Sequence, residues 1–303
     1  MYESLKQLCI EEETKGIPFW QLVQMEDCKE LQKTPEQSAR EMMTIYQAMR
    51  ASFEEYEDEL QSASGLVGGA GAMIYRRRTE GALLCGDFIG CVMEKALKIS
   101  ESNACMKRIV AAPTAGSCGV VPAVFLSIQD QRNLSDEQMV EGLYVAGGIG
   151  GVIAARASLS GAAGGCQAEI GAASAMAAGG LVYLQGGNAN DISNAAALAL
   201  KSLLGLACDP VAGLVEVPCV KRNVLGAVNA VTAADMTLAG IVSRIPADEV
   251  FDAMHNIGKH MDEEIRETAK GGLATTPTGM QFSEKIAMCL VTPRFLTKFL
   301  PLC

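Results

Sequence analysis

Two short stretches of the sequence each place a cysteine among residues that have almost no side chain. Residues 114–119 read TAGSCG, and residues 161–166 read GAAGGC. Small residues allow a backbone to come close to another group. Both loops therefore indicate something packed or bound beside Cys118 and Cys166.

The first stretch has the features of an anion-binding loop. Residues 112–119 precede the apolar run 120–128. A glycine-rich turn that leads into a helix presents free N–H groups and the positive end of the helix dipole. Thr114 and Ser117 add hydroxyl groups, which makes both residues candidates for substrate binding. A tight turn with an N-cap accounts for the same residues equally well. The stretch lacks the lysine of a Walker loop and the context of a dinucleotide fingerprint.

The number of cysteines points to thiol chemistry in a reducing compartment. The chain has 11 cysteines, and its first residues lack the apolar region of a signal peptide, so we expect a cytoplasmic protein. Cys166, Cys208 and Cys219 lie in loops beside glycine or proline, as ligands on stiff loops would. Three thiolates could hold an iron–sulfur cluster and leave one iron open as a Lewis acid. Because no Cys-x-x-Cys pair is present, buried structural thiols remain an alternative.

The elements that must position these loops are predicted to be helices. Residues 1–62 are polar and helical in pattern, a glycine-rich break covers 64–72, and residues 63–303 are richer in Gly and Ala. We expect a mostly α fold in which the N-terminal segment 1–62 packs with the helical catalytic domain 63–303 as one unit. Glycine-rich loops at helix N-termini would surround the site, and we find no confident strand. Candidate helices cover about 79–100, 120–130, 136–157, 166–183, 190–206, 220–242, 246–269 and 280–299. Predicted helix starts lie at Thr34, Ser135 and residues 191–194.

The composition excludes several classes of protein. Hydrophobic residues make up 49% but aromatic residues only 5%, so a core of small aliphatic side chains must fill closely packed helices. The net charge of −10 argues against nucleic acid as a partner, because phosphate binding needs clustered Lys and Arg. The most apolar stretches are too short and too rich in Gly and Ala to predict a membrane span.

Four segments resemble the α-chain of bacterial iron–sulfur-dependent L-serine dehydratases. They read IVAAPTAGSCGVVPAVF, SGAAGGCQAEIGAASAMAAGGL, LGLACDPVAGLVEVPCVKRN and GGLATTPTG, and the likeness runs from about residue 64 to residue 279. The resemblance implies a mostly helical lyase that converts L-serine to pyruvate and ammonia. It also implies that Cys166, Cys208 and Cys219 hold a 4Fe–4S cluster, with similar spacings of 42 and 11 residues. In single-chain members a C-terminal cysteine caps the cluster. Cys303 is the candidate here, although the stretch after residue 279 is not matched.

The general base is predicted to come from another chain. Dehydration needs a base within hydrogen-bond reach of the α-proton. The only two histidines, His255 and His260, lie on a polar segment that indicates a surface helix. The resemblance implies a family that occurs as one long chain or as α and β chains, and this chain looks like α alone. We therefore expect a hetero-oligomer with a β-subunit that provides the base, while the catalytic residue of this chain stays unknown.

Three other functions are alternatives to this interpretation. A pyridoxal-phosphate dehydratase is disfavoured because no lysine lies in a Ser-x-Lys-x-Arg-Gly setting. An L-cysteine desulfidase would keep the cluster and expel sulfide instead of hydroxide. A non-catalytic helical scaffold would bind no iron.

The roles of several further residues stay open in the sequence. Candidate counter-ions for the substrate ammonium are Glu169, Asp209 and Glu216, because each lies near a ligand cysteine. Lys107 precedes the anion loop and could neutralise a carboxylate, or could lie on the surface. Cys118 is expected beside the site. The predicted core thiols are Cys9, Cys28, Cys85, Cys91, Cys105 and Cys289.

Overall fold

The structure is a computed structural model that describes residues 2–291. Within this range the chain forms thirteen α-helices, joined by loops and short 3₁₀ or π turns, and its only strand-like pairing is a single bridge between Cys208 and Arg266. The prediction of a mostly α fold is confirmed. The helices are α1 (Leu5–Lys15), α2 (Phe19–Leu31), α3 (Pro35–Glu54), α4 (Ala70–Thr79), α5 (Gly86–Ala104), α6 (Val120–Arg132), α7 (Asp136–Arg156), α8 (Gly161–Gly164), α9 (Ala172–Leu184), α10 (Ala189–Lys201), α11 (Cys219–Leu238), α12 (Ala247–His260) and α13 (Pro277–Val291).

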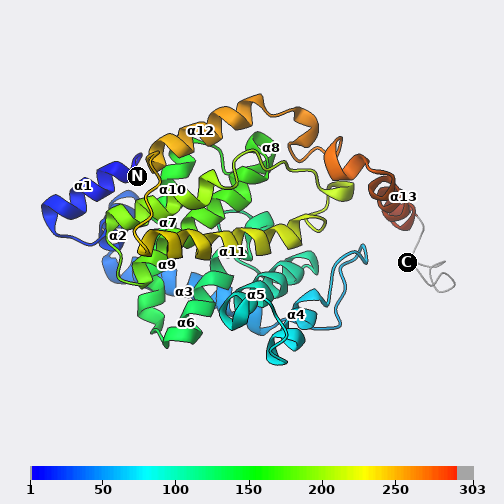
Figure 1. The fold of residues 1–303 in the computed structure, drawn as a ribbon, viewed down its shortest axis with the longest axis horizontal. Helices are drawn as coiled ribbons and strands as arrows, with labels where there is room; N and C mark the ends of the chain where they lie inside the picture. The colour runs from blue at the N-terminus through cyan, green and yellow to red at the C-terminus, as the bar shows by residue number, and fades with distance from the viewer. Residues whose placement is uncertain (1, 292–303) are drawn as a thin grey trace.

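Helix α9 lies at the centre of the fold and packs against α6, α7, α10 and α11 (Figure 1). Its sequence, AASAMAAGGLVYL, is apolar on all sides, as expected for a fully buried helix. A Cβ atom at Gly179 would lie 2.2 Å from Ile149 Cδ1, and one at Gly180 would lie 2.4 Å from Phe125 Cζ. Only glycine therefore allows α6 and α7 to approach α9 this closely, which explains why the core uses small residues.

The N-terminal helices share the core of the rest of the chain. Helix α1 packs against α10, α2 packs against α7, and α3 packs against α5 and α7. Buried Leu5, Phe19 and Tyr46 belong to the same hydrophobic cluster as Val121 and Leu198. The structure thus joins residues 1–62 to the later helices through one continuous apolar interior.

Two of the three predicted helix starts are confirmed. Thr34 and Ser135 each form a capping box, in which the side chains of the N-cap residue and the third helical residue bind each other's backbone N–H groups. The start predicted at 191–194 is wrong by about one turn. The N-cap is Asn188, and α10 begins at Ala189.

The region between residues 64 and 104 differs from the prediction. Helix α4 begins inside the expected break at 64–72, and α5 begins only at Gly86. Gly81 and Gly86 have φ angles of 67° and 76°, in the left-handed region that glycine adopts without strain. The single helix expected over 79–100 is therefore interrupted by a turn at 80–85.

The helix predicted over 246–269 is also too long. Helix α12 ends at His260, and Met261 is extended with φ −69° and ψ 136°. Glu267 and Ala269 then have positive φ angles of 64° and 55°. This segment leaves the helix because its backbone bonds with another part of the chain, as described below.

Helix α7 is, within residues 2–291, the one helix long and apolar enough to cross a membrane. Most of it is buried, and it packs against α2, α3 and α9. Its position inside the protein core accounts for its composition without a membrane.

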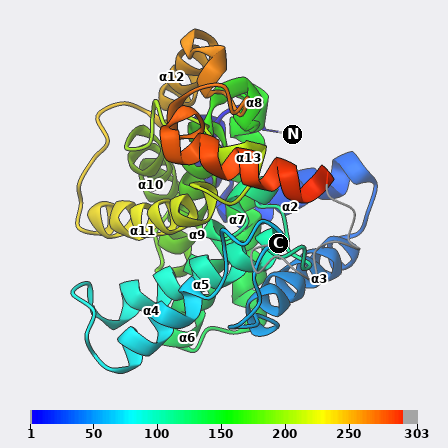
Figure 2. The ribbon, with the colours of Figure 1, turned by 90° about the vertical axis from the view of Figure 1, so that its right-hand side faces the viewer.

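The C-terminal half places the cysteine-bearing loops at one end of the molecule. Helix α12 crosses one side of the fold, and α13 lies at the end opposite α1 (Figure 1). Figure 2 shows this end, with α13 nearest the viewer. Helix α13 packs against the turn Val211–Gly213, which lies within the loop between α10 and α11, and against the turn Gly272–Thr275, which directly precedes α13. These two turns also contact each other, and the first of them lies in the loop that leads into α11.

Candidate functional site

The three cysteines predicted as ligands are buried and come from three separate segments. Cys166 directly precedes the π turn Gln167–Gly171 that leads into α9, Cys208 lies in the loop after α10, and Cys219 is the first residue of α11. The sulfur atoms of Cys166 and Cys208 and a carboxylate oxygen of Glu169 lie within 4.8 Å of one another. Single π turns are frequent at functional sites, and this turn is what directs Glu169 toward the two thiols.

The environment makes one of these thiols more acidic and the other two less acidic. The hydrogen bond from Cys208 lowers the pKa of Cys166, and the positive charge of Arg222 also favours its thiolate against the effect of burial. The same contact raises the pKa of Cys208, and burial adds to the shift. Burial, followed by the negative charges of Cys166 and Glu169, raises the pKa of Cys219 to about 12. The three sulfurs therefore share one site of low polarity, where a bound cation would be needed to keep all three as thiolates.

A later segment of the chain covers the Cys208 loop. The Cys208 N–H donates to Ile265 O at 2.8 Å, and the Glu267 N–H donates to Cys208 O at 2.7 Å. One residue further on, Asp209 Oδ2 accepts from the Leu273 N–H at 2.8 Å. These bonds replace the intrahelical bonds that would have extended α12. They also fix residues 265–273 against the site.

Glu169 lies between the two glycine-rich loops. Its Oε1 accepts a hydrogen bond from Thr114 Oγ1 at 2.7 Å. A Cβ atom at Gly161 would lie 2.9 Å from Glu169 Oε2, 3.1 Å from Cys208 Sγ and 3.1 Å from Glu267 Oε2. Burial raises the pKa of Glu169, the hydrogen bond from Thr114 opposes this shift, and the charge of Glu267 adds to it. Gly161 thus faces a thiol and two carboxylates.

The first loop is held mainly by protein contacts. The Thr114 N–H donates to Ser117 Oγ at 3.3 Å, and the Gly119 N–H donates to Asn223 Oδ1 at 2.9 Å. Ser117 is fully buried and acts as a capping residue. Burial raises the pKa of Cys118, which lies deep in the core, to about 12. Thr114 reaches Glu169, so it is closer to the chemistry than Ser117, and the role of both in substrate binding stays a prediction.

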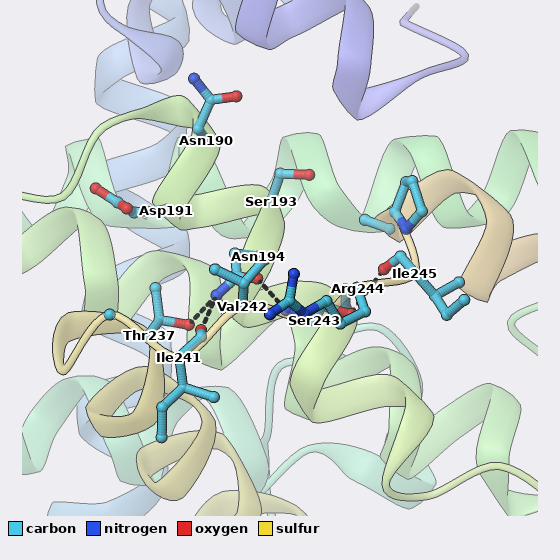
Figure 3. Close-up of a pocket in the computed structure, with 14 residues that line it drawn as sticks. Asn190, Asp191, Ser193, Asn194, Thr237, Ile241, Val242, Ser243, Arg244 and Ile245 are labelled. Carbon is cyan, nitrogen blue, oxygen red and sulfur yellow. Dashed lines mark hydrogen bonds between the residues drawn. The ribbon is translucent and has the colours of Figure 1, made fainter.

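A pocket of about 380 Å³ lies away from the cysteines, between the start of α10 and the connection from α11 to α12 (Figure 3). Asn194 Nδ2 donates to Thr237 Oγ1 at 2.9 Å and to Ile241 O at 2.8 Å. Asn194 Oδ1 accepts from the Ser243 N–H at 2.8 Å. These bonds tie α10 to the α11–α12 connection, so Asn194, Thr237 and Ser243 have structural roles in this pocket.

Comparison with known proteins identifies the family. Residues 14–274 match the family described as "Serine dehydratase alpha chain". The "Probable L-serine dehydratase, alpha chain" of Bacillus subtilis is 45% identical over 286 residues, which cover 94% of this chain and 95% of the relative. The chain belongs to the serine dehydratase alpha chain family.

Two further relatives show how this serine dehydratase alpha chain compares with shorter and longer proteins. The "L-serine dehydratase, alpha chain" of Peptoniphilus asaccharolyticus is 40% identical over 268 residues, which cover 88% of this chain and 92% of the relative. The "L-serine dehydratase TdcG" of Escherichia coli is 45% identical over 181 residues, which cover 59% of this chain but only 40% of the relative. The resemblance inferred from the four sequence segments is thereby confirmed.

Two predicted polar candidates have partners elsewhere. Glu216 Oε2 accepts from Ser62 Oγ at 2.9 Å and also from Ser64 Oγ. Lys107 Nζ pairs with Glu57 Oε1 at 2.7 Å. Both side chains therefore hold the connection that follows α3, and neither has a hydrogen bond or ion pair with Cys166, Cys208 or Cys219 in the described part of the chain.

The two histidines lie on α12, as the sequence predicts. His260 is exposed, and its Nδ1 lies 2.7 Å from Asn256 O of the same helix. His255 is half-buried. The predicted tail ligand Cys303 lies outside the described residues.

The prediction of core thiols holds for some cysteines only. Cys9 is buried. The prediction is wrong for Cys85, which is exposed because it lies in the turn before α5 and not inside a helix. Partly exposed thiols are Cys28, Cys91 and Cys105, and the side chain of Cys289 lies outside the described part of the chain.

Sequence reasoning missed three residues of this site. Arg222 and Asn223 stand in the matched segment but carry no local mark of their role, and Glu267 reaches the site only because its segment pairs with Cys208. Arg222 lies one helical turn after Cys219 on α11. The i, i+3 spacing between Cys219 and Arg222 was the only signal in the sequence that their side chains would lie on the same side of a helix.

The donor set of this serine dehydratase alpha chain fits an iron–sulfur cluster. Two buried thiols from separate segments, Cys166 and Cys208, lie together beside Glu169, and the buried thiol of Cys219 is near enough to interact with the charge of Cys166. Thiolate sulfur is the ligand that such clusters require. The absence of a side chain at Gly161 leaves space directly beside Cys208 Sγ. The chemistry of the residues present therefore agrees with the predicted cofactor.

Proposed function

We propose that this chain is the catalytic α-subunit of an L-serine dehydratase that uses a 4Fe–4S cluster and works with a β-subunit. The observation that carries the proposal is a buried site in which Cys166, Cys208 and Glu169 lie within 4.8 Å of one another. Cys219 is also buried, and it lies near enough for the charge of Cys166 to act on it. The match to serine dehydratase alpha chains over most of the chain supports the same conclusion. The reaction is the elimination of water from L-serine, followed by hydrolysis of aminoacrylate to pyruvate and ammonia.

The cysteine site would hold the cluster through its three thiolates. When bound, the cluster supplies a Lewis acid that makes the substrate hydroxyl a better leaving group. The residues of this chain position the thiolates, keep the site dry and bind the substrate. The cytoplasm, where thiols stay reduced, is the predicted location.

Substrate binding by this chain is best explained by the carboxylates near Gly161. Among the predicted counter-ions, Asp209 pairs with Arg222 and Glu216 binds two serines. Of the predicted counter-ions, Glu169 remains. It faces Gly161 beside Cys208 together with Glu267, which the sequence did not predict. Two carboxylates there would attract the substrate ammonium, while Thr114 orients Glu169 through its hydroxyl.

Water must be kept from the site until elimination is complete. Residues 265–273 lie across the Cys208 loop, held by the hydrogen bonds described above. The GGLATTPTG segment belongs to this cover, because Gly272 packs against Asp209 and a Cβ there would lie 2.4 Å from Asp209 Oδ2. The cover explains why a motif distant in sequence belongs to the active site.

A second chain would supply what the α-subunit lacks. More than half of the Escherichia coli relative lies outside its alignment with this chain, which covers 40% of that protein. The surroundings of the site also expose large apolar side chains, with 37% of Val215, 42% of Leu273 and 49% of Met280 accessible. These observations support a β-subunit that packs near the site and brings the general base.

The test is turnover by the purified chain. The protein would be purified without oxygen, reconstituted with iron and sulfide, and assayed for pyruvate from L-serine and sulfide from L-cysteine. We expect the cluster to form but turnover to stay low until a β-subunit is added. Full turnover of L-serine by this chain alone would overturn the partner proposal. Faster release of sulfide than of pyruvate would favour an L-cysteine desulfidase.

A further inference from the structure

Arg222 connects all three cysteine-bearing segments. It lies on α11, one turn after Cys219. Its Nη1 donates to Cys166 Sγ at 3.4 Å and to Ala207 O at 2.8 Å. Its Nη2 pairs with Asp209 Oδ1 at 2.8 Å. The guanidinium thus contacts Cys166 and both sequence neighbours of Cys208. The helix that carries Arg222 also carries Cys219.

The ion pair of Arg222 is largely removed from solvent. The side chains of Arg222 and Asp209 are 15% and 7% exposed. Burying an ion pair is costly unless further hydrogen bonds satisfy both groups. Asp209 has such a bond, because its Oδ2 accepts from Leu273 N–H of the covering segment at 2.8 Å. The network therefore continues from Cys166 through Arg222 and Asp209 to the cover.

The charge of Arg222 matches the need of the site. Cys166, Cys208 and Glu169, three groups that are negative when ionised, lie within 4.8 Å of one another in a largely buried place. The guanidinium is permanently positive, and its planar fork bonds in several directions at once. Its Nη1 lies 3.4 Å from Cys166 Sγ, so the positive charge is placed directly beside a ligand sulfur.

We propose that Arg222 is the positioning residue of the cysteine site. It holds Cys166 and the 207–209 loop in register with Cys219, so that the three sulfurs are arranged for a thiophilic metal before that metal arrives. This inference rests on the proposed function to the extent that the thiols bind a metal. It assigns Arg222 no contact with substrate.

The test measures metal binding by the apoprotein, without activity. Co²⁺ would be titrated anaerobically into the reduced, cluster-free chain, and thiolate-to-cobalt charge-transfer absorption would report binding. Outer partners of metal ligands typically change affinity about 10–100-fold when removed, so we expect R222Q to weaken Co²⁺ binding by this amount. R222K keeps the charge but loses the fork, so its affinity should fall between those of R222Q and the wild type.

Arg156 provides a matched control within the same chain. It forms a forked ion pair with Asp252 at 3.0 and 2.6 Å, and it donates to Glu3 O at 3.1 Å. R156Q removes an equivalent network away from the cysteines and should leave Co²⁺ affinity within about twofold of the wild type, since it touches no metal-ligand partner. Circular dichroism and thermal melting would establish that each variant folds. If R222Q does not fold, the comparison of R222K with R156K replaces it.

The outcomes separate this inference from the proposed function. Wild-type charge-transfer absorption with unchanged affinity in R222Q or R222K would overturn the role of Arg222 and leave the metal site intact. A wild-type chain without this absorption would overturn the inference, because the thiols would then not be arranged to bind a metal ion before the cluster forms. The proposed function would be tested separately by the iron and sulfide content of the reconstituted chain. Weaker binding in R222Q, partial recovery in R222K and normal binding in R156Q would support the inference.

Discussion

The two glycine-rich loops that carry Cys118 and Cys166 look alike in sequence and differ in what surrounds them. Burial raises the pKa of Cys118 to about 12. Cys166 is also buried, yet the hydrogen bond from Cys208 and the charge of Arg222 lower its pKa. The first thiol is therefore an apolar core residue, and the second is prepared to act as a thiolate.

Helix α11 explains much of this difference, because two consecutive residues of it reach the two loops. Asn223 donates to Gly116 O at 2.8 Å and accepts from the Gly119 N–H at 2.9 Å, so a neutral amide holds the first loop. Arg222 donates to Cys166 and brings a positive charge to the second. Two glycine-rich loops with a similar sequence thus differ in role because Asn223 contacts the first and Arg222 contacts the second.

The largest expected effect is on the iron content of the chain, which should depend on Cys166 in the second loop and not on Cys118 in the first. After anaerobic reconstitution we expect about four irons and four acid-labile sulfides per chain, as for a 4Fe–4S cluster. The C166S/C208S/C219S variant should lose essentially all of both, whereas C118A should keep them. Metal and sulfide analysis checks this result. Loss of iron in C118A would show that the two loops are not different in function.

Glycine substitutions should sharpen the comparison through stability and iron together. A Cβ atom at Gly119 would lie 2.4 Å from Ser100 Oγ and 2.7 Å from the backbone Ala96 O. Because this overlap cannot be relieved by a flexible side chain alone, G119A should destabilise the fold by about 1–3 kcal/mol. A Cβ atom at Gly161 meets a thiol and two carboxylates instead, so G161A should lose iron and serine turnover at a smaller cost in stability.

Urea unfolding and iron analysis of both variants would measure these effects, and Gly147 offers the control. Nothing lies within 4 Å of a Cβ atom at this position in α7. G147A should therefore keep its iron and gain up to about 1 kcal/mol from helix propensity. A G161A chain with normal iron and normal turnover would count against a functional second loop.

The smallest effect is a difference in how stability depends on pH. The pKa of Cys118 is raised from its ordinary value of 9.0 to about 12 in the folded chain. Its contribution to stability is therefore complete below about pH 9 and is lost as pH rises towards 12, because only the unfolded chain releases the proton easily. Cys118 alone lowers the free energy of unfolding by up to about 1.4 kcal/mol for each unit that the pH rises in this window. Urea unfolding between pH 8 and 10 should show a flatter pH dependence in C118A, and identical slopes would contradict the assignment.

Much of the fold follows from local sequence. The caps at Thr34 and Ser135 depend on residues three positions apart, and the apolar run of α9 is continuous, so both were predictable. The ends of α5 and α12 were not, because left-handed glycines and pairing with Cys208 decide where those helices start and stop. Local patterns predict that a helix exists better than they predict its limits.

A helical chain, two small-residue loops and three cysteines with the spacing of a known family can be recognised without any structure. The position of Glu169, one turn after Cys166, is also local information. The contact of Arg222 with Cys166, the pairing of the Glu267 backbone with Cys208 and the burial of Cys118 in the core depend on how distant segments fold together. The physical reason is that a thiol's acidity depends on charges and hydrogen bonds within a few ångströms, and here those neighbours come from segments about 40 to 100 residues away along the chain.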